Sequence, residues 1–216
     1  MSPVPAPALR VKSRWFRSDR SHAPAQQASA MAFIVWRAAQ QLLRRMRAAD
    51  FDVDTGAPYF AFLREVLVFL VAVVDRLAAA RLGDADRVAF TTALVQHLAR
   101  TLADNEDELL GPPPAGAAPH AHRFIDLVNE LAPHYAQFGA DPQPAEPQAG
   151  FTPDFAFMRY LGSRLEATLP PKDRLWVIDQ VIAIEAPDAV AVVQRAMREL
   201  HDPAPRPRRP AAAGGD

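Results

Sequence analysis

The chain has 216 residues, of which 50% are hydrophobic and 23% are charged, and it contains no cysteine. This length allows one domain or two small ones, and the missing cysteines exclude disulfides, thiolate nucleophiles and cysteine-ligated metal centres. The formal net charge of −1 conceals an uneven distribution: residues 31–202 carry 16 basic and 23 acidic side chains, a net charge of −7. Residues 1–30 and 203–216 are net basic, so the sequence predicts an acidic body with two basic tails.

Both tails are rich in proline and arginine and lack apolar periodicity, so we expect a disordered basic arm over residues 1–27 and a disordered tail over residues 203–216. The arm has no apolar run of the kind that forms a secretory signal, which favours a cytoplasmic location. Its arginine-rich composition also suits an organelle transit peptide, and Met31 is an alternative start of translation.

Apolar side chains recur at three- and four-residue intervals along most of the chain, a spacing typical of amphipathic helices. We expect these helices at residues 28–49, 58–82, 86–109, 120–138, 153–169 and 172–201, with Pro187 splitting or kinking the last one. The second contains nine consecutive apolar residues from Val66 to Val74. A membrane span needs about 20 apolar residues. The run is therefore predicted to be the central, most buried helix of a bundle.

Local sequence also predicts caps and buried faces. Thr55 and Thr152 each stand shortly before a proline at the start of a helix, so both are expected to act as N-caps. Side chains such as Phe155, Leu175 and Val88 fall on the apolar repeats of their helices and are expected to face the core.

No segment alternates with a period of two, so the predicted fold class is all-α, a compact bundle of six to seven helices. Proline-rich stretches at residues 111–118 and 139–150 cannot be helical and are expected to form long loops. Either half of the chain would bury only a small core by itself. Residues 28–202 are therefore predicted to form a single domain.

Motifs for nucleophilic catalysis or phosphate binding are missing, so no catalytic residue and no cofactor is predicted. Carboxylates and histidines beside apolar runs are the weaker candidates for a metal-binding or ligand-binding bundle. They are Glu65, Asp75, His97, Glu130, His134 and Asp179. The sequence lacks the Glu-x-x-His motif of di-iron bundles, and the Glu130–His134 spacing crosses Pro133, so a metal is not predicted.

Two acidic segments are further candidate sites. Residues 50–56 place three aspartates at alternate positions, but a calcium loop needs glycine where Thr55 stands and glutamate where Ala61 stands. An interhelical loop is the preferred interpretation. Residues 104–108 place four acids at a helix C-terminus, where they predict a solvated, frayed end or a docking patch for a basic partner. His120, beside the following loop, is expected to be solvated.

These observations favour a non-enzymatic helical protein that acts through protein–protein interaction, as an adaptor or regulatory subunit, with a protein partner or self-association. The first alternative is a helical-bundle enzyme that binds a metal or small ligand. The second is weak nucleic-acid binding by the basic tails. Because the body is acidic, nucleic acid is the disfavoured partner, and no membrane span is predicted.

Overall fold

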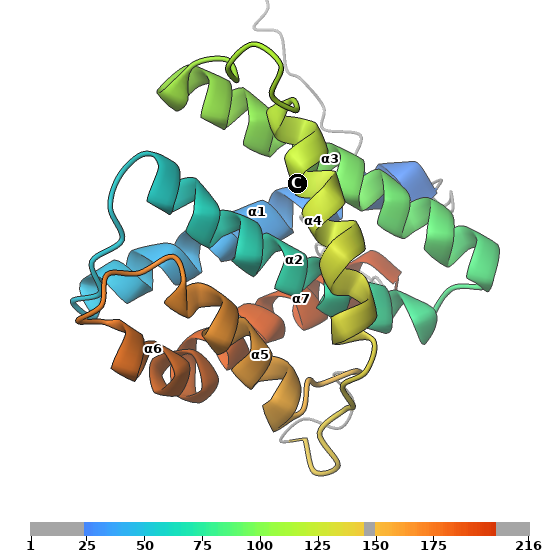
Figure 1. Cartoon of the computed structure of the whole chain (residues 1–216). Coiled ribbons are helices and arrows are strands. Elements are labelled where there is room, and N and C mark those ends of the chain that lie inside the picture. Colours follow the sequence, from blue (N-terminus) through green and yellow to red (C-terminus); the bar gives the residue numbers. More distant parts are fainter. Residues whose placement is uncertain (1–23, 145–149, 202–216) are drawn as a thin grey trace, which may run out of the picture.

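A computed structural model of the chain describes residues 24–144 and 150–201, and within these ranges the protein is a bundle of α-helices without a β-strand (Figure 1). The helices are α1 (Pro24–Ala48), α2 (Ala57–Ala79), α3 (Asp84–Leu110), α4 (His120–Tyr135), α5 (Phe155–Glu166), α6 (Arg174–Gln180) and α7 (Ala186–His201). A π-helical segment (Val181–Glu185) joins α6 to α7 without a break, so the described chain forms six continuous helical rods. The predicted all-α fold is confirmed.

Helix α1 begins at Pro24, four residues before the predicted start, so residues 24–27 are helical rather than part of an extended arm. The remainder of the predicted disorder, in residues 1–23 and 203–216, lies outside the described residues.

Helix α2 occupies the centre of the bundle, as the run of nine apolar residues predicted. It packs against α1, α3, α4, α5 and α7, and side chains from Val66 to Val71 are all buried. Its length and composition also match those of a membrane-spanning helix, the one such helix in the described part of the chain. Two-thirds of the qualifying window is nevertheless buried by the other helices, as expected for a core helix.

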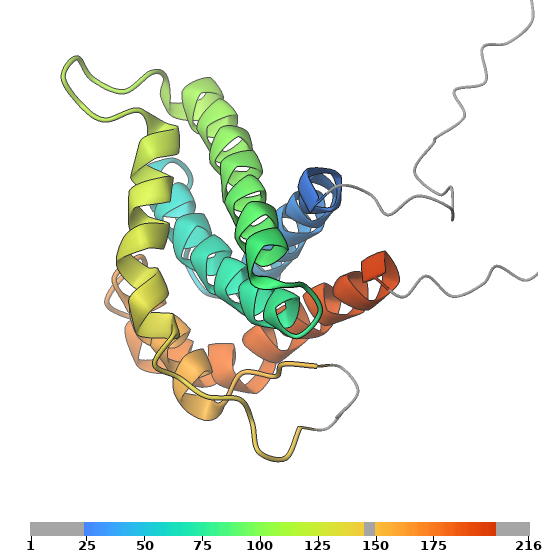
Figure 2. The same ribbon diagram turned by 90° about the vertical axis from the view of Figure 1, so that its right-hand side faces the viewer.

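Helices α3 and α4 form a long hairpin over α2, and the loop between them projects from one end of the molecule (Figure 2). Residues 111–119 form this loop, as their prolines predicted. Helix α4 contains Pro133 and ends two residues later, at Tyr135. The helix therefore continues through Pro133, and it ends three residues before the predicted end at residue 138.

The last helical stretch, residues 174–201, is not broken at Pro187 but contains one widened turn before it. Pro187 has no N–H and its ring would clash with the carbonyl of Ala183 in a regular α-helix. In the π-helical segment before it the N–H of Ala186 donates to the Val181 carbonyl, five residues back. Pro187 was correctly predicted to disturb the last helix. The disturbance is a π-helical turn just before the proline.

The predicted caps are wrong at both threonines. The residue before α2 is Gly56, in a left-handed conformation with φ 90°, and no side chain caps this helix. Before α5, Asp154 rather than Thr152 accepts the hydrogen bond from the Phe157 N–H at 2.8 Å. Helix α2 begins at Ala57 and α5 at Phe155, so the N-cap positions are Gly56 and Asp154, one and two residues after the threonines.

Three predicted core side chains face outward. Leu175 is 80% exposed, and Phe155 and Val88 are also exposed, at the starts of α6, α5 and α3 respectively. The buried neighbours are Val177, Phe157 and Phe90, each two residues further along its helix. A helix start leaves too few residues to establish the phase of the repeat, and tertiary packing decides it.

Candidate functional site

The two candidate acids on α2 are both ion-paired within the protein, but not with their neighbouring arginines. Glu65 is buried and accepts two hydrogen bonds from Arg164 of α5, at 3.0 and 2.7 Å. Asp75 accepts hydrogen bonds from Arg87, through both of its carboxylate oxygens, and from Thr91 at 2.9 Å. These pairs fasten α5 and α3 to the central helix.

Of the other four candidates, Glu130 and His134 share α4, whereas His97 and Asp179 lie on α3 and α6. His97 is half-buried on α3 with its Nδ1 3.3 Å from Arg100, and burial, followed by the charge of Arg100, lowers its pKa below the usual range. His134 on α4 stacks on Tyr160 of α5 with ring centroids 5.9 Å apart. Glu130 on α4 and Asp179 on α6 are exposed.

Within residues 24–144 and 150–201, no three histidine or carboxylate side chains gather closely enough to hold a metal ion. The aspartate loop between α1 and α2 also does not converge on a cation. Its Phe51 and Val53 are buried, and Asp52 instead lies 3.2 Å from Lys172 Nζ. The backbone N–H of Asp52 donates to Asp173, so this loop fastens the α1–α2 turn to the start of α6.

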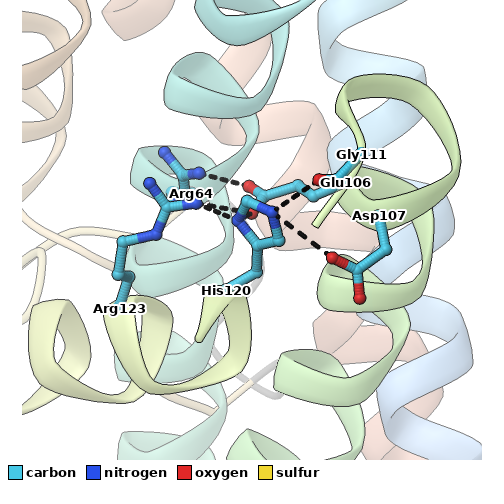
Figure 3. Close-up of polar contacts among 6 residues, drawn as sticks. All are labelled: Arg64, Glu106, Asp107, Gly111, His120 and Arg123. Carbon is cyan, nitrogen blue, oxygen red and sulfur yellow. Dashed lines mark hydrogen bonds and ion pairs between the residues drawn. The ribbon is translucent and has the colours of Figure 1, made fainter. Parts of the chain in front are cut away.

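A buried polar cluster at the α3–α4 end of the bundle was not predicted. Its centre is Glu106, the middle residue of the acidic run on α3, whose side chain is fully buried. One carboxylate oxygen accepts a hydrogen bond from Arg64 of α2, and the other lies 2.6 Å from His120 Nδ1 and 3.5 Å from Arg123 of α4 (Figure 3). The cluster therefore links three helices through one carboxylate.

His120 is held from both sides of its ring. Nε2 lies 3.2 Å from the Gly111 carbonyl oxygen and 3.4 Å from Asp107, so both neighbours are acceptors and this nitrogen carries a proton. Nδ1 faces two different groups, the Glu106 carboxylate, which accepts, and the Arg123 guanidinium, which donates. A protonated ring thus bonds Glu106, whereas a neutral ring accepts from Arg123.

Burial raises the pKa of the Glu106 carboxyl above its usual range, against the opposing effect of the Arg64 and Arg123 charges. The expectation that residues 104–108 are a solvated end is therefore wrong for Glu106, and His120, which is buried, was also wrongly placed in solvent. The partners of the cluster are its own side chains and the loop backbone, so its evident task is to close the α3–α4 hairpin onto α2.

A signal for this cluster was present in the sequence. Phe90, Leu94, Leu98 and Leu102 recur at intervals of four and are all buried, and Glu106 is the next position of the same stripe. The loop then places His120 opposite it: α3 ends at Gly111, which has φ 82°, and the rigid prolines that follow return the chain to α4.

Two hollows are exposed to solvent. A cleft of about 230 Å³ lies between α2, α3 and α4. Its wall includes Val68, Val128 and Tyr135, and the Asp75–Arg87 pair contributes to its lining. The polar atoms of that pair already bond each other, so the cleft offers mainly apolar surface to a ligand.

The second hollow is a groove of about 520 Å³ between α5 and the stretch formed by α6 and the π-helical segment. It is called the α5–α6 groove below, and it is lined by Phe155, Arg159, Leu175, Ile178, Asp179, Ile182 and Ala183. Its floor is fixed by a close helix contact, because Gly162 of α5 lies against Ile178: a Cβ at position 162 would be 3.0 Å from the Ile178 Cα.

Comparisons with known proteins give no relative: no family model matches the chain, and no curated protein or solved structure is significantly similar to it.

Proposed function

We propose that this chain is a non-enzymatic helical protein that acts through protein–protein interaction, as an adaptor or regulatory subunit, and that the α5–α6 groove is its contact surface. The observation that carries the proposal is the exposure of large apolar side chains there. Leu175 on the groove wall is 80% exposed, and its neighbour Trp176 is 65% exposed.

Exposed apolar side chains are frequent in the segment that forms the groove, and two of them, Phe155 and Leu175, line it. Of the nine large apolar side chains exposed in the described part of the chain, four lie between residues 155 and 184, and these are Phe155, Leu175, Trp176 and Ile184. Single exposed apolar residues are ordinary on protein surfaces, whereas a group of them beside a groove is typical of an interaction site. Tryptophan and phenylalanine are also the residue types enriched at the centres of protein interfaces.

The secondary structure of the groove supports the same proposal. Ile182 and Ala183 of its wall belong to the π-helical segment, and π-turns inside α-helices occur frequently at functional sites. The buried cluster around Glu106 lacks such access, because both the carboxylate and the His120 ring are enclosed.

A crosslinking experiment tests the proposal. A photoreactive amino acid replaces Trp176 in the full chain, in the cells that naturally produce it, and Arg195, exposed on α7 outside the groove, is replaced as the matched control. We expect a covalent protein adduct from position 176 that mass spectrometry identifies and that Leu175→Asp abolishes. Adducts no more abundant at position 176 than at position 195 would contradict the proposal.

A further inference from the structure

We propose that the partner held in the α5–α6 groove is a second copy of this chain, in a two-fold symmetric dimer. This inference rests on the proposed function and names its partner. It starts from the two charged side chains that line the groove, Arg159 on the α5 side and Asp179 on the α6 side.

Neither charge is used within the described molecule. Other arginines on neighbouring elements are engaged: Arg164 bonds Glu65, and Arg45 bonds Glu185 and Asp188. Arg159 and Asp179 are exposed and make no ion pair or side-chain hydrogen bond with any residue in 24–144 or 150–201. One groove therefore presents one cation, one anion and several apolar side chains.

This combination is complementary to itself. In a dimer with a two-fold axis the same patch faces its own copy, so that residue i meets residue j and residue j meets residue i. With the axis passing between Arg159 and Asp179, Arg159 of each copy meets Asp179 of the other. The exposed apolar side chains of the groove, Leu175 and Phe155, lie on the same face and are covered in the same contact. Charge complementarity of this kind determines register and partner choice at an interface. A partner of one charge sign would match only half of this surface.

Charge reversal tests the proposed pairing. Arg159→Asp places like charges opposite each other at both ends of the dimer, and so does Asp179→Arg. Each single variant of the full chain is expected to dimerise more than about tenfold more weakly than the wild type, because facing like charges are strongly unfavourable at an interface. An equimolar mixture of the two variants restores both opposite-charge pairs. We therefore expect the mixture to dimerise when neither variant does so alone.

The measurement is sedimentation equilibrium of the wild type, both variants and their mixture between about 1 and 100 µM. Arg195→Asp on α7 is the matched control and is expected to leave the association constant unchanged. Circular dichroism establishes that each variant is folded, as expected for substitutions at exposed positions.

A wild type that remains monomeric throughout, or variants whose mixture fails to associate while the wild type does, would overturn the second-copy proposal. These outcomes are distinct from failure of the proposed function. A monomeric chain that still gives the Leu175-dependent adduct with a different protein retains the function and loses the dimer.

Discussion

Two regions of the molecule invert the usual relation between polarity and burial. At the α3–α4 end, the carboxylate of Glu106 is fully buried in a sequence of acids that resembles a solvated helix terminus. On the α5–α6 face, Leu175 and Trp176 are exposed in a segment that resembles a core helix. The first inversion is compensated inside the molecule by arginine and histidine partners, whereas the second has no compensation within the described chain. Large apolar side chains that remain exposed on one face indicate a surface that binds another molecule.

The largest effect is expected from removing the centre of the buried cluster. Glu106→Ala leaves Arg64 and His120 without their counter-charge in a buried setting, which costs about 3–5 kcal/mol of unfolding free energy. Chemical denaturation measures this loss. Glu108→Ala, an exposed acid in the same run, is the matched control and should change stability by no more than about 0.5 kcal/mol. Equal losses in the two variants would mean that Glu106 is not the centre of a buried pair.

A smaller effect is expected where α5 meets α6 beneath the groove. Gly162→Ala places a methyl group 3.0 Å from the Ile178 Cα, and a backbone atom has little freedom to move away. The resulting strain outweighs the better helix propensity of alanine, for a net loss of about 1 kcal/mol. Thermal unfolding compares this variant with Ser163→Ala, an exposed neighbour. A Gly162→Ala protein as stable as wild type would show that α5 and α6 can separate freely.

The pH dependence of protein stability tests the raised pKa of Glu106 in the buried cluster. Because the pKa of Glu106 is raised in the folded protein, the folded state holds its proton more tightly than the unfolded state does. Its contribution to stability is therefore complete below the usual carboxyl pKa and is lost as the pH rises through the raised value. Denaturation of wild type and Glu106→Gln across this range should show the wild type losing its advantage as the pH increases. A constant difference between them at every pH would contradict the raised pKa.

The smallest effect on folding is expected at the exposed face itself. Leu175→Ala should change the unfolding free energy by no more than about 0.5 kcal/mol, because its side chain is already in solvent. Val177→Ala on the buried side of α6 should cost about 2 kcal/mol. Comparable losses at the two positions, measured by denaturation, would mean that α6 is packed with a different face toward the core.

Long helices with a repeated apolar pattern were the predictable part of this fold. The buried run in α2 extends over several turns, so its length and composition determine that the helix is buried. The seven-residue α6 offers two turns and a proline-rich entry, and its pattern alone did not determine whether Leu175 or Val177 faces inward.

The candidate sites were less predictable, because they depend on pairs that are distant in sequence. The partner of Glu65 is Arg164, 99 residues away, while the adjacent Arg64 reaches across to Glu106. Adjacent charges on α2 do not pair with each other, since consecutive helical residues point in different directions. Exposure of the groove likewise depends on which helices cover which faces, and this is a property of the assembled bundle.

The central claim is that the α5–α6 groove binds a second copy of this chain, and hydrogen–deuterium exchange tests it most directly. The full chain is exchanged while dilute and while concentrated, and the rates are compared by mass spectrometry for peptides covering residues 174–185 and residues 104–123. We predict slower exchange of residues 174–185 in the concentrated sample and unchanged exchange of residues 104–123. Equal exchange of residues 174–185 at both concentrations, or protection confined to residues 104–123, would contradict the account.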